Sequence, residues 1–426
     1  KKSGTFRDNE QVEVRAMDSN DIERERGITI LAKTTSIHYN GYKINILDTP
    51  GHADFGGEVE RIMNMVDGVL LLVDAYEGTM PQTRFVLKKA LEAGVKPIVV
   101  INKVDKPTAR VEKVLDEVID LFIELGASEE QLDFKVAYVS ALNGTASLDP
   151  DISTQSESYD DIFNLIINEI PEPNANPDGN LQFQPALLDY NEYVGRIGIG
   201  KVHSGTLKVN EMVSCVRLDG SIKQFRIQKL FGFDGLKRVE INEAKAGDIA
   251  AVAGLMDISV GETICNVGKE EALPILRIDE PTLKMTFMVN NSPFVGKEGS
   301  IVTARKIGER LFKETQKDVS LKVEESGNES WVVSGRGELH LSILIENLRR
   351  EGFELQVSKP EVIIKEIDGV KCEPYEDVQI EVSDEAVGNV IEALGLRGGK
   401  MDNMSNVNNL IRLNYTIPSR GLIGFN

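Results

Sequence analysis

The sequence predicts a chain of several domains: an α/β domain first, a small β-barrel next and two α+β domains after it. At 426 residues the chain is too long for one hydrophobic core, and a length prior gives about three domains. Strand-like and helix-like apolar patterns alternate from residue 34 to residue 170, which is typical of a parallel sheet covered by helices on both faces. Short strand-like runs separated by glycine turns follow, and these are typical of an antiparallel barrel.

The first domain, placed at residues 1–173, is expected to contain a tight hairpin and then a regular alternation of strands and helices. Asn40-Gly41 lies between two strand-like runs and is the signal for a two-residue type I′ turn. The proline-rich stretch 171–177 ends the alternation as a linker. The expected strands are 35–39, 42–47, 69–73, 98–101 and 136–140, and the expected helices are 83–93, 111–125 and 160–170.

The second domain, placed at residues 181–272, shows no helical period. Turns such as Ser204-Gly205 and Asp219-Gly220 separate its short runs of β-forming residues. We therefore predict a small antiparallel barrel. Its expected strands are 186–190, 195–203, 211–217, 221–230 and 249–252.

The two remaining domains are placed at residues 280–362 and 373–426. The third domain has the order β-α-β-β-α-β, which is ferredoxin-like, and the fourth begins the same order. The fourth ends before its last helix and strand, so we expect the natural protein to continue beyond Asn426. The expected elements are strands 282–289, 319–324, 330–333, 353–357, 377–382, 400–404 and 410–416, and helices 301–312, 338–350 and 384–394.

Composition limits the classes of function. The net charge of −20 argues against a general nucleic-acid-binding protein, because phosphate contacts need clustered lysine and arginine. Cys215, Cys265 and Cys372 are far apart and form no CxxC motif, so neither a zinc site nor a disulfide framework is indicated. No apolar run approaches the roughly 20 residues that cross a bilayer. A reducing, cytoplasmic setting without a membrane is expected.

The chemistry is expected at the end of a buried strand. The apolar run 44–47 leads into Asp48-Thr-Pro-Gly51-His52, and a carboxylate before a glycine turn marks the edge where open α/β sheets hold ligands. A DxxG motif alone is weak, because many loops contain one by chance. Here it stands between Arg26-Gly-Ile-Thr29 upstream and the motifs 102–105 and 140–142 downstream. This order and spacing predict a guanine-nucleotide site.

Selection of guanine is assigned to Asn102-Lys103-Val104-Asp105 and to the loop Ser140-Ala141-Leu142. The Asp105 carboxylate can accept hydrogen bonds from guanine N1 and N2, and adenine lacks this edge. With adenine bound, the carboxylate would be left unpaired, and such unpaired buried polar groups can give selectivity for the correct base on the order of 10⁴. Asn102 would brace the loop, the stem of Lys103 would cover the base, and the backbone at Ser140 and Ala141 would donate to O6. The alternative is a polar loop after a strand with no ligand.

The phosphate end is assigned to residues upstream. Thr29 and Asp48 are hard oxygen ligands suited to Mg²⁺, and the Gly51 amide would sense the γ-phosphate. Loss of that phosphate would release both loops, as in the order–disorder switch of GTPases. His52 is the candidate for orienting the attacking water, since the work of such enzymes is mainly positioning. Alternatively, His52 only begins a helix.

One part of such a site is expected to be missing. A phosphate-binding loop GxxxxGK[ST] should precede Lys1, together with the first strand of the sheet. The near-match at residues 195–201 has Val202 in place of the hydroxyl residue, and it lies in an expected barrel strand with no helix N-terminus behind it. As written, the chain is expected to bind GTP poorly and to fold poorly.

The motifs resemble those of a known family. Residues 24–30, 48–52 and 102–105 resemble the switch and guanine motifs of translational GTPases, and the barrel and residues 334–341 resemble domains II and III of elongation factor G. Only twelve residues separate Pro360 from Glu373, so a domain IV does not fit. Residues 51–61 and 417–425 are similar to the TypA/BipA family and less similar to the LepA type.

This resemblance implies a cytoplasmic bacterial GTPase, a monomer that binds GTP or GDP with Mg²⁺. It implies association with both ribosomal subunits, ribosomal RNA and tRNA, and roles in large-subunit assembly and stress adaptation. His52 matches the histidine that ribosomal RNA positions for hydrolysis, and Ile28 matches a residue of the hydrophobic gate. The leading hypothesis is therefore a ribosome-associated GTPase. The alternative is a nucleotide-incompetent fragment that acts only as a ribosome- or RNA-binding module, and an elongation-factor-like translocase conflicts with the lack of domain IV.

Overall fold

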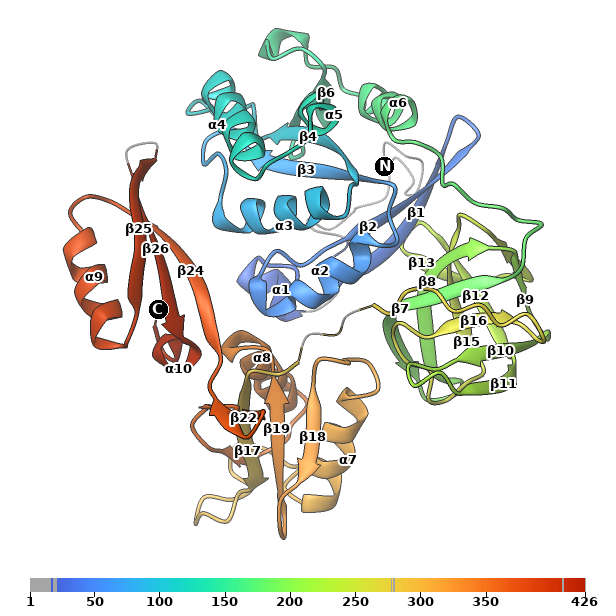
Figure 1. Cartoon of the computed structure of the whole chain (residues 1–426), viewed down its shortest axis with the longest axis vertical. Coiled ribbons are helices and arrows are strands. Elements are labelled where there is room, and N and C mark those ends of the chain that lie inside the picture. Colours follow the sequence, from blue (N-terminus) through green and yellow to red (C-terminus); the bar gives the residue numbers. More distant parts are fainter. Residues whose placement is uncertain (1–16, 18–20, 277, 279, 408–409, 426) are drawn as a thin grey trace. The chain divides into compact units, whose positions relative to one another are not determined.

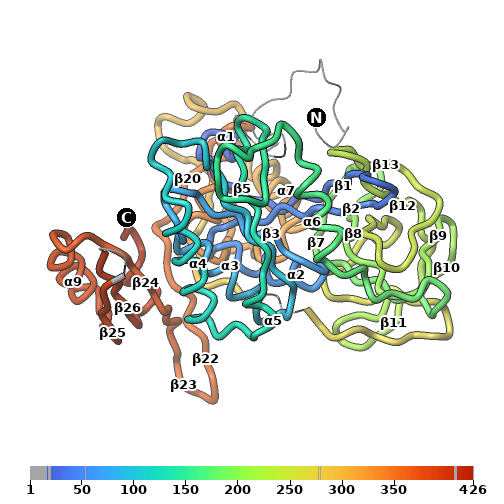
Figure 2. The backbone as a smooth tube through the Cα atoms, turned by 90° about the horizontal axis from the view of Figure 1, so that it is seen from above, coloured from blue at the N-terminus to red at the C-terminus, as the bar shows by residue number. Residues whose placement is uncertain are grey.

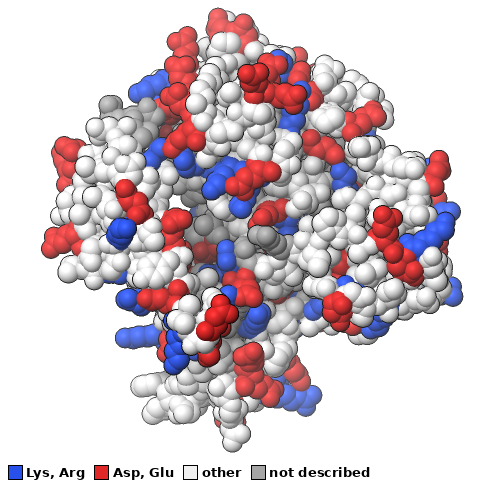
Figure 3. All heavy atoms as spheres, in the orientation of Figure 1, with Lys and Arg blue, Asp and Glu red and all other residues white. Residues whose placement is uncertain are grey.

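A computed structural model describes residues 17, 21–276, 278, 280–407 and 410–425 of the chain. The chain divides into two compact units, Lys1–Arg277 and Ile278–Asn426 (Figure 1). None of the described helices is both long enough and apolar enough to cross a membrane. On the face drawn in Figure 3, aspartate and glutamate side chains are interspersed with lysine and arginine.

The first unit begins with an α/β domain. Its sheet contains three parallel strands, β3, β4 and β5, with β6 antiparallel to β5. Strands β1 and β2 form a separate hairpin, whose turn at Asn40 and Gly41 has the two positive φ angles, 48° and 83°, that a type I′ turn needs. The elements are α1 (Asp21–Arg26), β1 (Lys33–Tyr39), β2 (Tyr42–Asp48), η1 (Ala53–Phe55), α2 (Gly56–Met63), β3 (Gly68–Asp74), α3 (Pro81–Glu92), β4 (Lys96–Asn102), α4 (Val111–Glu124), α5 (Glu129–Leu132), β5 (Lys135–Ser140), β6 (Thr145–Ser147), η2 (Ile152–Thr154) and α6 (Asp160–Glu169).

Helices cover both faces of this parallel sheet, as predicted. Alternate residues of β4 point to opposite faces, so Val99 and Ile101 pack with α3 and α4, whereas Ile98 and Val100 pack with α6. Leu87 of α3 and Phe122 of α4 are fully buried in the first of these cores. The two cores hold the carboxyl ends of the strands in fixed positions.

An antiparallel β domain completes the first unit. Eight of its strands form one sheet in the order β11-β10-β16-β7-β8-β15-β12-β13, and β9 pairs with β14. Residues 195–201 lie in β8, as expected, and a Cβ at Gly200 would lie 1.9 Å from the Gln184 carbonyl oxygen. The close approach of β7 therefore explains that glycine without a phosphate. The strands are β7 (Gln182–Asn191), β8 (Gly195–Ser204), β9 (Thr206–Lys208), β10 (Met212–Val216), β11 (Ile222–Arg226), β12 (Lys229–Asp234), β13 (Lys237–Glu240), β14 (Glu243–Lys245), β15 (Ile249–Ala253) and β16 (Thr263–Asn266).

One predicted strand of this domain is wrong. Residues 221–230 were expected to form a single strand, but they form β11 and the beginning of β12. The Ile227 N–H donates to the Glu211 carbonyl, whereas the next N–H, of Gln228, donates to the Ala253 carbonyl. The chain thus changes its pairing partner from β10 to β15 at this point, and a local apolar pattern contains no sign of that change.

The hairpin β1–β2 and helix α2 both contact the β domain. The N–H groups of Ser36 and Gly235 donate to each other's carbonyl oxygens, so β1 lies beside the β12–β13 turn (Figures 1 and 2). The Asp248 carboxylate accepts hydrogen bonds from Lys43 at 2.7 Å and from Asn45 at 3.0 Å. From α2, the buried Arg61 donates from Nε to the Ala186 carbonyl at 3.0 Å. The residues around Asp48 are therefore anchored on two sides.

The second unit contains two sheets that pack with helices and a separate two-stranded sheet formed by β22 and β23. The first sheet has the order β18-β19-β17-β20, with β21 also paired to β17, and α7 and α8 pack on its buried face. The second has the order β24-β26-β25 and packs against α9. The elements are β17 (Leu283–Val289), α7 (Ala304–Glu314), β18 (Lys322–Glu325), β19 (Ser330–Gly335), α8 (Glu338–Arg350), β20 (Leu355–Val357), β21 (Glu361–Val362), β22 (Lys365–Ile367), β23 (Val370–Cys372), β24 (Tyr375–Val382), α9 (Val387–Leu396), β25 (Lys400–Val407), β26 (Leu410–Pro418) and α10 (Ser419–Leu422).

Candidate guanine-nucleotide site

Three neighbouring strands end at one edge of the parallel sheet. Strands β3, β4 and β5 end at Asp74, Asn102 and Ser140, and the strand register places Asp74 opposite Asn102 and Asn102 opposite Val139. The carboxyl edge of such a sheet is where α/β proteins bind ligands. Two of the predicted motifs, 102–105 and 140–142, begin at this edge.

Asn102 joins the loops that follow β4 and β5. Its Oδ1 atom accepts a hydrogen bond from the Lys103 N–H at 2.8 Å and another from the Ala141 N–H at 3.1 Å. Lys103 has a φ of +64°, which is uncommon for a residue with a side chain and is typical of functional loops. The side chain of Asn102 therefore fixes both loops relative to each other.

Asp74 is a residue of this edge that the sequence analysis missed. Its carboxylate lies 2.6 Å from the Lys103 ammonium and 3.6 Å from that of Lys106, and it accepts the N–H groups of Tyr76 and Glu77. Burial raises the pKa of Asp74, but Lys103 and the two N–H donors outweigh burial and lower the pKa to about 2. Its signal in the sequence is the same as that of Asp48: a carboxylate at the end of an apolar strand.

Most of the other protein residues assigned to guanine binding lie on the surface. Lys103, Asp105, Ala141 and Leu142 are exposed, whereas Ser140 is buried and its hydroxyl accepts the Asn143 N–H at 3.3 Å. The turn after β5 is thus held closed from within. Because the Ala141 N–H already donates to Asn102, a guanine O6 would share that donor.

Asp48 ends the hairpin strand β2, and His52 lies in the loop that follows it. His52 Nδ1 accepts the Asp54 N–H at 3.2 Å, which assigns the proton of the neutral ring to Nε2. The ring lies edge-on to Phe55 at 6.4 Å, and 42% of the His52 side chain is exposed. A Cβ at Gly51 would make only an ordinary contact, 3.7 Å, with Gln82. The fold therefore has room for a side chain at position 51.

The segment that contains Ile28 and Thr29 is anchored by a second missed residue, Glu23 of α1. The buried Glu23 carboxylate accepts the Ile30 N–H at 2.9 Å and the Leu31 N–H at 3.1 Å, and it pairs with Lys33. Burial raises the pKa of Glu23, but the Lys33 contact and the two N–H bonds outweigh it and the pKa is lowered. Buried glutamates rarely stand out in a sequence, and RxRGIT gives no direct sign of this one.

The strand register brings the two phosphate-end segments together. Lys33 at the start of β1 is paired with Asp48 at the end of β2, so the segment with Thr29 enters the hairpin at the end where Asp48 lies. A threonine hydroxyl and a carboxylate are hard oxygen donors, so the chemistry of this pair fits Mg²⁺. Ile28 and Thr29 are both half-buried.

The fold and this edge define a GTP-binding protein of the translation-factor class. Residues 1–172 match the model of the elongation factor Tu GTP binding domain, residues 195–265 match elongation factor Tu domain 2, and residues 370–426 match the elongation factor G C-terminus. A crystal structure of a Thermus thermophilus protein is similar with a TM-score of 0.64 at 16% identity, covering 96% of this chain and 87% of that one. That likeness concerns the fold alone.

Similar curated proteins identify the family. The large ribosomal subunit assembly factor BipA of Bacillus subtilis (strain 168) is 66% identical over 425 residues, which are 99% of this chain and 69% of that protein. The proteins of the same name from Escherichia coli (strain K12) and Synechocystis are 54% and 52% identical, with 99% and 100% of this chain and 70% and 71% of those proteins covered. The chain belongs to the BipA family and is a GTP-hydrolysing enzyme.

Proposed function

We propose that the chain binds the guanine base at the carboxyl edge of β4 and β5. The observation that carries this proposal is the pair of hydrogen bonds from the Lys103 and Ala141 N–H groups to Asn102 Oδ1, because it sets both guanine motifs at fixed positions on one edge. Asp105 lies exposed on the loop after β4, and its carboxylate accepts hydrogen bonds from guanine N1 and N2. The 140–142 turn after β5 faces guanine O6. The Asp74–Lys103 ion pair orients the lysine stem over the base.

The phosphate end of this proposed site is formed by the hairpin and the segment before it. Mg²⁺, when bound, supplies positive charge at the β- and γ-phosphates. Thr29 and Asp48 would hold it through their oxygens, and the Gly51 amide would contact the γ-phosphate. Since the fold itself leaves room for a side chain at position 51, the need for glycine there comes from the nucleotide. Ile28 serves as the gate residue beside Thr29.

His52 is proposed to orient the attacking water. With Nδ1 engaged by the Asp54 N–H, the ring presents Nε2–H, a donor that can hold a water oxygen in place. The contact with Phe55 restricts rotation of the ring. Positioning is the main catalytic requirement in phosphoryl transfer, so a poised neutral imidazole is sufficient.

The cellular role is proposed from the relatives, which are named large ribosomal subunit assembly factors. This chain would act as a cytoplasmic monomer that hydrolyses GTP while bound to the ribosome, with contacts to both subunits, ribosomal RNA and tRNA and a part in stress adaptation. We also propose that the domains at residues 280–362 and 373–426 are ferredoxin-like. The sheet order β18-β19-β17-β20 supports this for the first of them, since it is the order expected for β-α-β-β-α-β.

A nucleotide titration of the full chain tests the proposed site. A fluorescent GDP would be titrated into the protein with Mg²⁺ and then competed with GTP or ATP. Saturable binding that GTP displaces and ATP does not displace is the expected result. Displacement by ATP at similar concentrations would contradict the assignment of Asp105, and a lack of binding up to high micromolar concentration would favour the binding-module alternative.

A further inference from the structure

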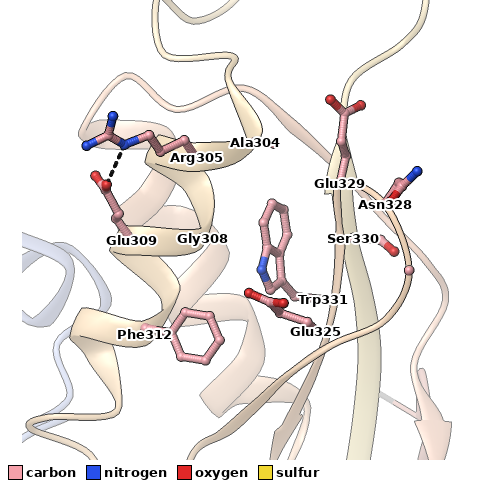
Figure 4. A pocket seen from close by; sticks show the side chains of 11 residues that line it. Ala304, Arg305, Gly308, Glu309, Phe312, Glu325, Asn328, Glu329, Ser330 and Trp331 are labelled. Carbon is pink, nitrogen blue, oxygen red and sulfur yellow. Dashed lines mark hydrogen bonds and ion pairs between the residues drawn. The ribbon is translucent and has the colours of Figure 1, made fainter.

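The second unit contains a groove that shares no residue with the candidate nucleotide site. It has a volume of about 660 Å³ and lies between helix α7 and the hairpin β18–β19 (Figure 4). Its lining includes two aromatic side chains, Trp331 and Phe312, and three carboxylates, Glu309, Glu325 and Glu329. The groove therefore combines aromatic surface with negative charge.

The aromatic part of the groove is fixed by close packing. Gly308 lies on the same face of α7 as Phe312, four residues on, and a Cβ at position 308 would lie 2.9 Å from Cζ2 of Trp331. The glycine thus lets the indole ring lie against the helix. Only 6% of Trp331 is exposed, whereas 38% of Phe312 is exposed. Phe312 is consequently the more accessible of the two rings.

The acidic wall is held by the hairpin. Glu325 is paired with Trp331 across β18 and β19, so both side chains lie on the same face of the sheet, as Figure 4 shows. In the turn, the Ser326 N–H donates to the Ser330 carbonyl at 3.0 Å. The Glu329 carbonyl accepts the Val289 N–H at 3.1 Å, which anchors the turn to β17. The two glutamates are thus presented from a fixed backbone.

Charge indicates what the groove would accept. Arg305, the cation of the lining, donates from Nε to Glu309 at 2.8 Å on the outer side of α7 (Figure 4). Within the described part of the chain, no lysine or arginine forms an ion pair with Glu325 or Glu329. Glu325 lies beside the Trp331 ring, and the Glu329 carboxylate at the end of the hairpin points away from it (Figure 4). This negative wall repels a phosphate backbone but suits a guanidinium or ammonium group, which can stack on the accessible ring and pair with Glu325.

We propose that this groove binds an arginine- or lysine-bearing segment of a basic protein. The cationic side chain lies against Phe312 and pairs with Glu325, while Glu329 adds negative charge at the rim of the groove. This interaction adds a protein-docking surface to the second unit and requires no bound nucleotide. The proposal can therefore be tested independently of the GTP site.

The sole tryptophan of the chain gives a direct readout, because Trp331 is in the lining. The full chain without nucleotide would be titrated with a peptide of alternating arginine and glycine at about 0.15 M salt, where distant charges are screened. A saturable change in tryptophan emission is expected. The same peptide with neutral citrulline in place of arginine is expected to give none, and equal binding of the citrulline peptide would overturn the proposal.

A matched pair of variants locates the binding. Replacing Glu325→Gln and Glu329→Gln together is expected to weaken the arginine peptide about tenfold, whereas Glu324→Gln, on the same strand but the opposite face, leaves it unchanged. Phe312→Leu keeps an apolar side chain but removes the ring, and it is expected to weaken binding as well. Equal weakening by Glu324→Gln would overturn the proposal. An oligouridylate that changes Trp331 emission more strongly in the double variant than in the unchanged protein would also overturn the proposal, because that result would indicate an RNA-binding surface.

Discussion

At the candidate site, Asn102 holds two loops together through one side-chain oxygen. The sequence predicts that Asn102 braces its own loop, because an NKxD motif after a strand is recognisable locally. Its second bond reaches Ala141, 39 residues further along the chain, and depends on β5 lying beside β4. Glu23 was missed for the same reason, because this carboxylate becomes interpretable only when the cation and N–H groups around it are known, whereas Asp74 carries the strand-end signal described above.

Asp105→Asn should weaken GTP binding and relax selectivity toward xanthine nucleotides. An amide presents one acceptor and one donor where the carboxylate presents two acceptors, so guanine N1 and N2 are no longer both satisfied. Competition titrations with GTP and XTP measure the change, and we expect a loss of about tenfold or more for GTP. Asp116→Asn, on the exposed face of α4, is the control. Undiminished GTP affinity in Asp105→Asn would refute the guanine assignment.

His52→Ala should leave nucleotide affinity unchanged and suppress ribosome-stimulated turnover, by about a hundredfold if water orientation is its role. Phosphate release in the presence of ribosomes is the measurement, with the GDP titration as its companion. His38→Ala, an exposed histidine on β1, should behave as the unchanged protein does. If turnover of His52→Ala matches that of His38→Ala, His52 only begins the helix.

The longer helices and most strands of the chain were predictable because each carries its own apolar period, whereas the short helices α1, α5 and α10 were not expected. Helix α8 was predicted with the bounds observed, Glu338–Arg350, and the type I′ hairpin is formed as expected. The break between β11 and β12 was not predictable, because it is set by a change of neighbouring strand. Short strands such as β14 and β21 were missed, since three or two residues are too few to show a period.

Glu354 supports a prediction about one element of the second unit, the loop after β17. Its carboxylate accepts the N–H groups of Gly296, Glu298 and Gly299 at 2.9, 2.9 and 3.0 Å, as well as the Asn290 amide. The Gly296 and Glu298 N–H bonds, which outweigh the cost of burial, lower the pKa of Glu354 to about 2. A lowered pKa means that this stabilisation is present above the ordinary value of 4.5 and is lost as the pH falls toward 2.

Glu354→Gln should therefore lower the free energy of unfolding of the second unit at neutral pH and flatten its dependence on pH between about 4.5 and 2. Tryptophan emission during denaturant unfolding reports this unit, since Trp331 lies in its core. Glu361→Gln, at the exposed start of β21, serves as the comparison. A variant as stable as that comparison at pH 7 would show that the carboxylate does not organise the loop.

At the scale of the molecule, the sequence predicts the succession of α/β and β domains and the family, because the motifs that carry them are local. The contacts between the α/β and β domains could not be predicted. Asp248 contacts Lys43 and Asn45 across more than 200 residues of sequence, and Arg61 contacts the backbone of β7. Such contacts depend on how the two folded domains pack against each other, and the apolar pattern of neither domain predicts that packing.

Asp248→Ala should loosen the hairpin from the β domain and lower the unfolding free energy of the first unit by about 1 kcal/mol, the usual size for a partly exposed ion pair with one further hydrogen bond. Thermal unfolding measures it. Glu240→Ala removes an exposed ion pair to Lys229 within the β domain and should have a smaller effect. A Tm shift no larger than that of Glu240→Ala would mean that the Asp248 contacts contribute nothing to holding the two domains together.

The contact between the hairpin and the β12–β13 turn has a consequence for synthesis of the chain on the ribosome. Thr35 donates to the Gly235 carbonyl, and the two residues are 200 positions apart. At synthesis rates of about 5 to 20 residues per second, the hairpin emerges about 10 to 40 s before its partner strands. During that interval the edge of β1 has no neighbour from the β domain. The growing chain therefore passes through a stage in which the hairpin that ends at Asp48 exists without the β-domain contacts that later hold it.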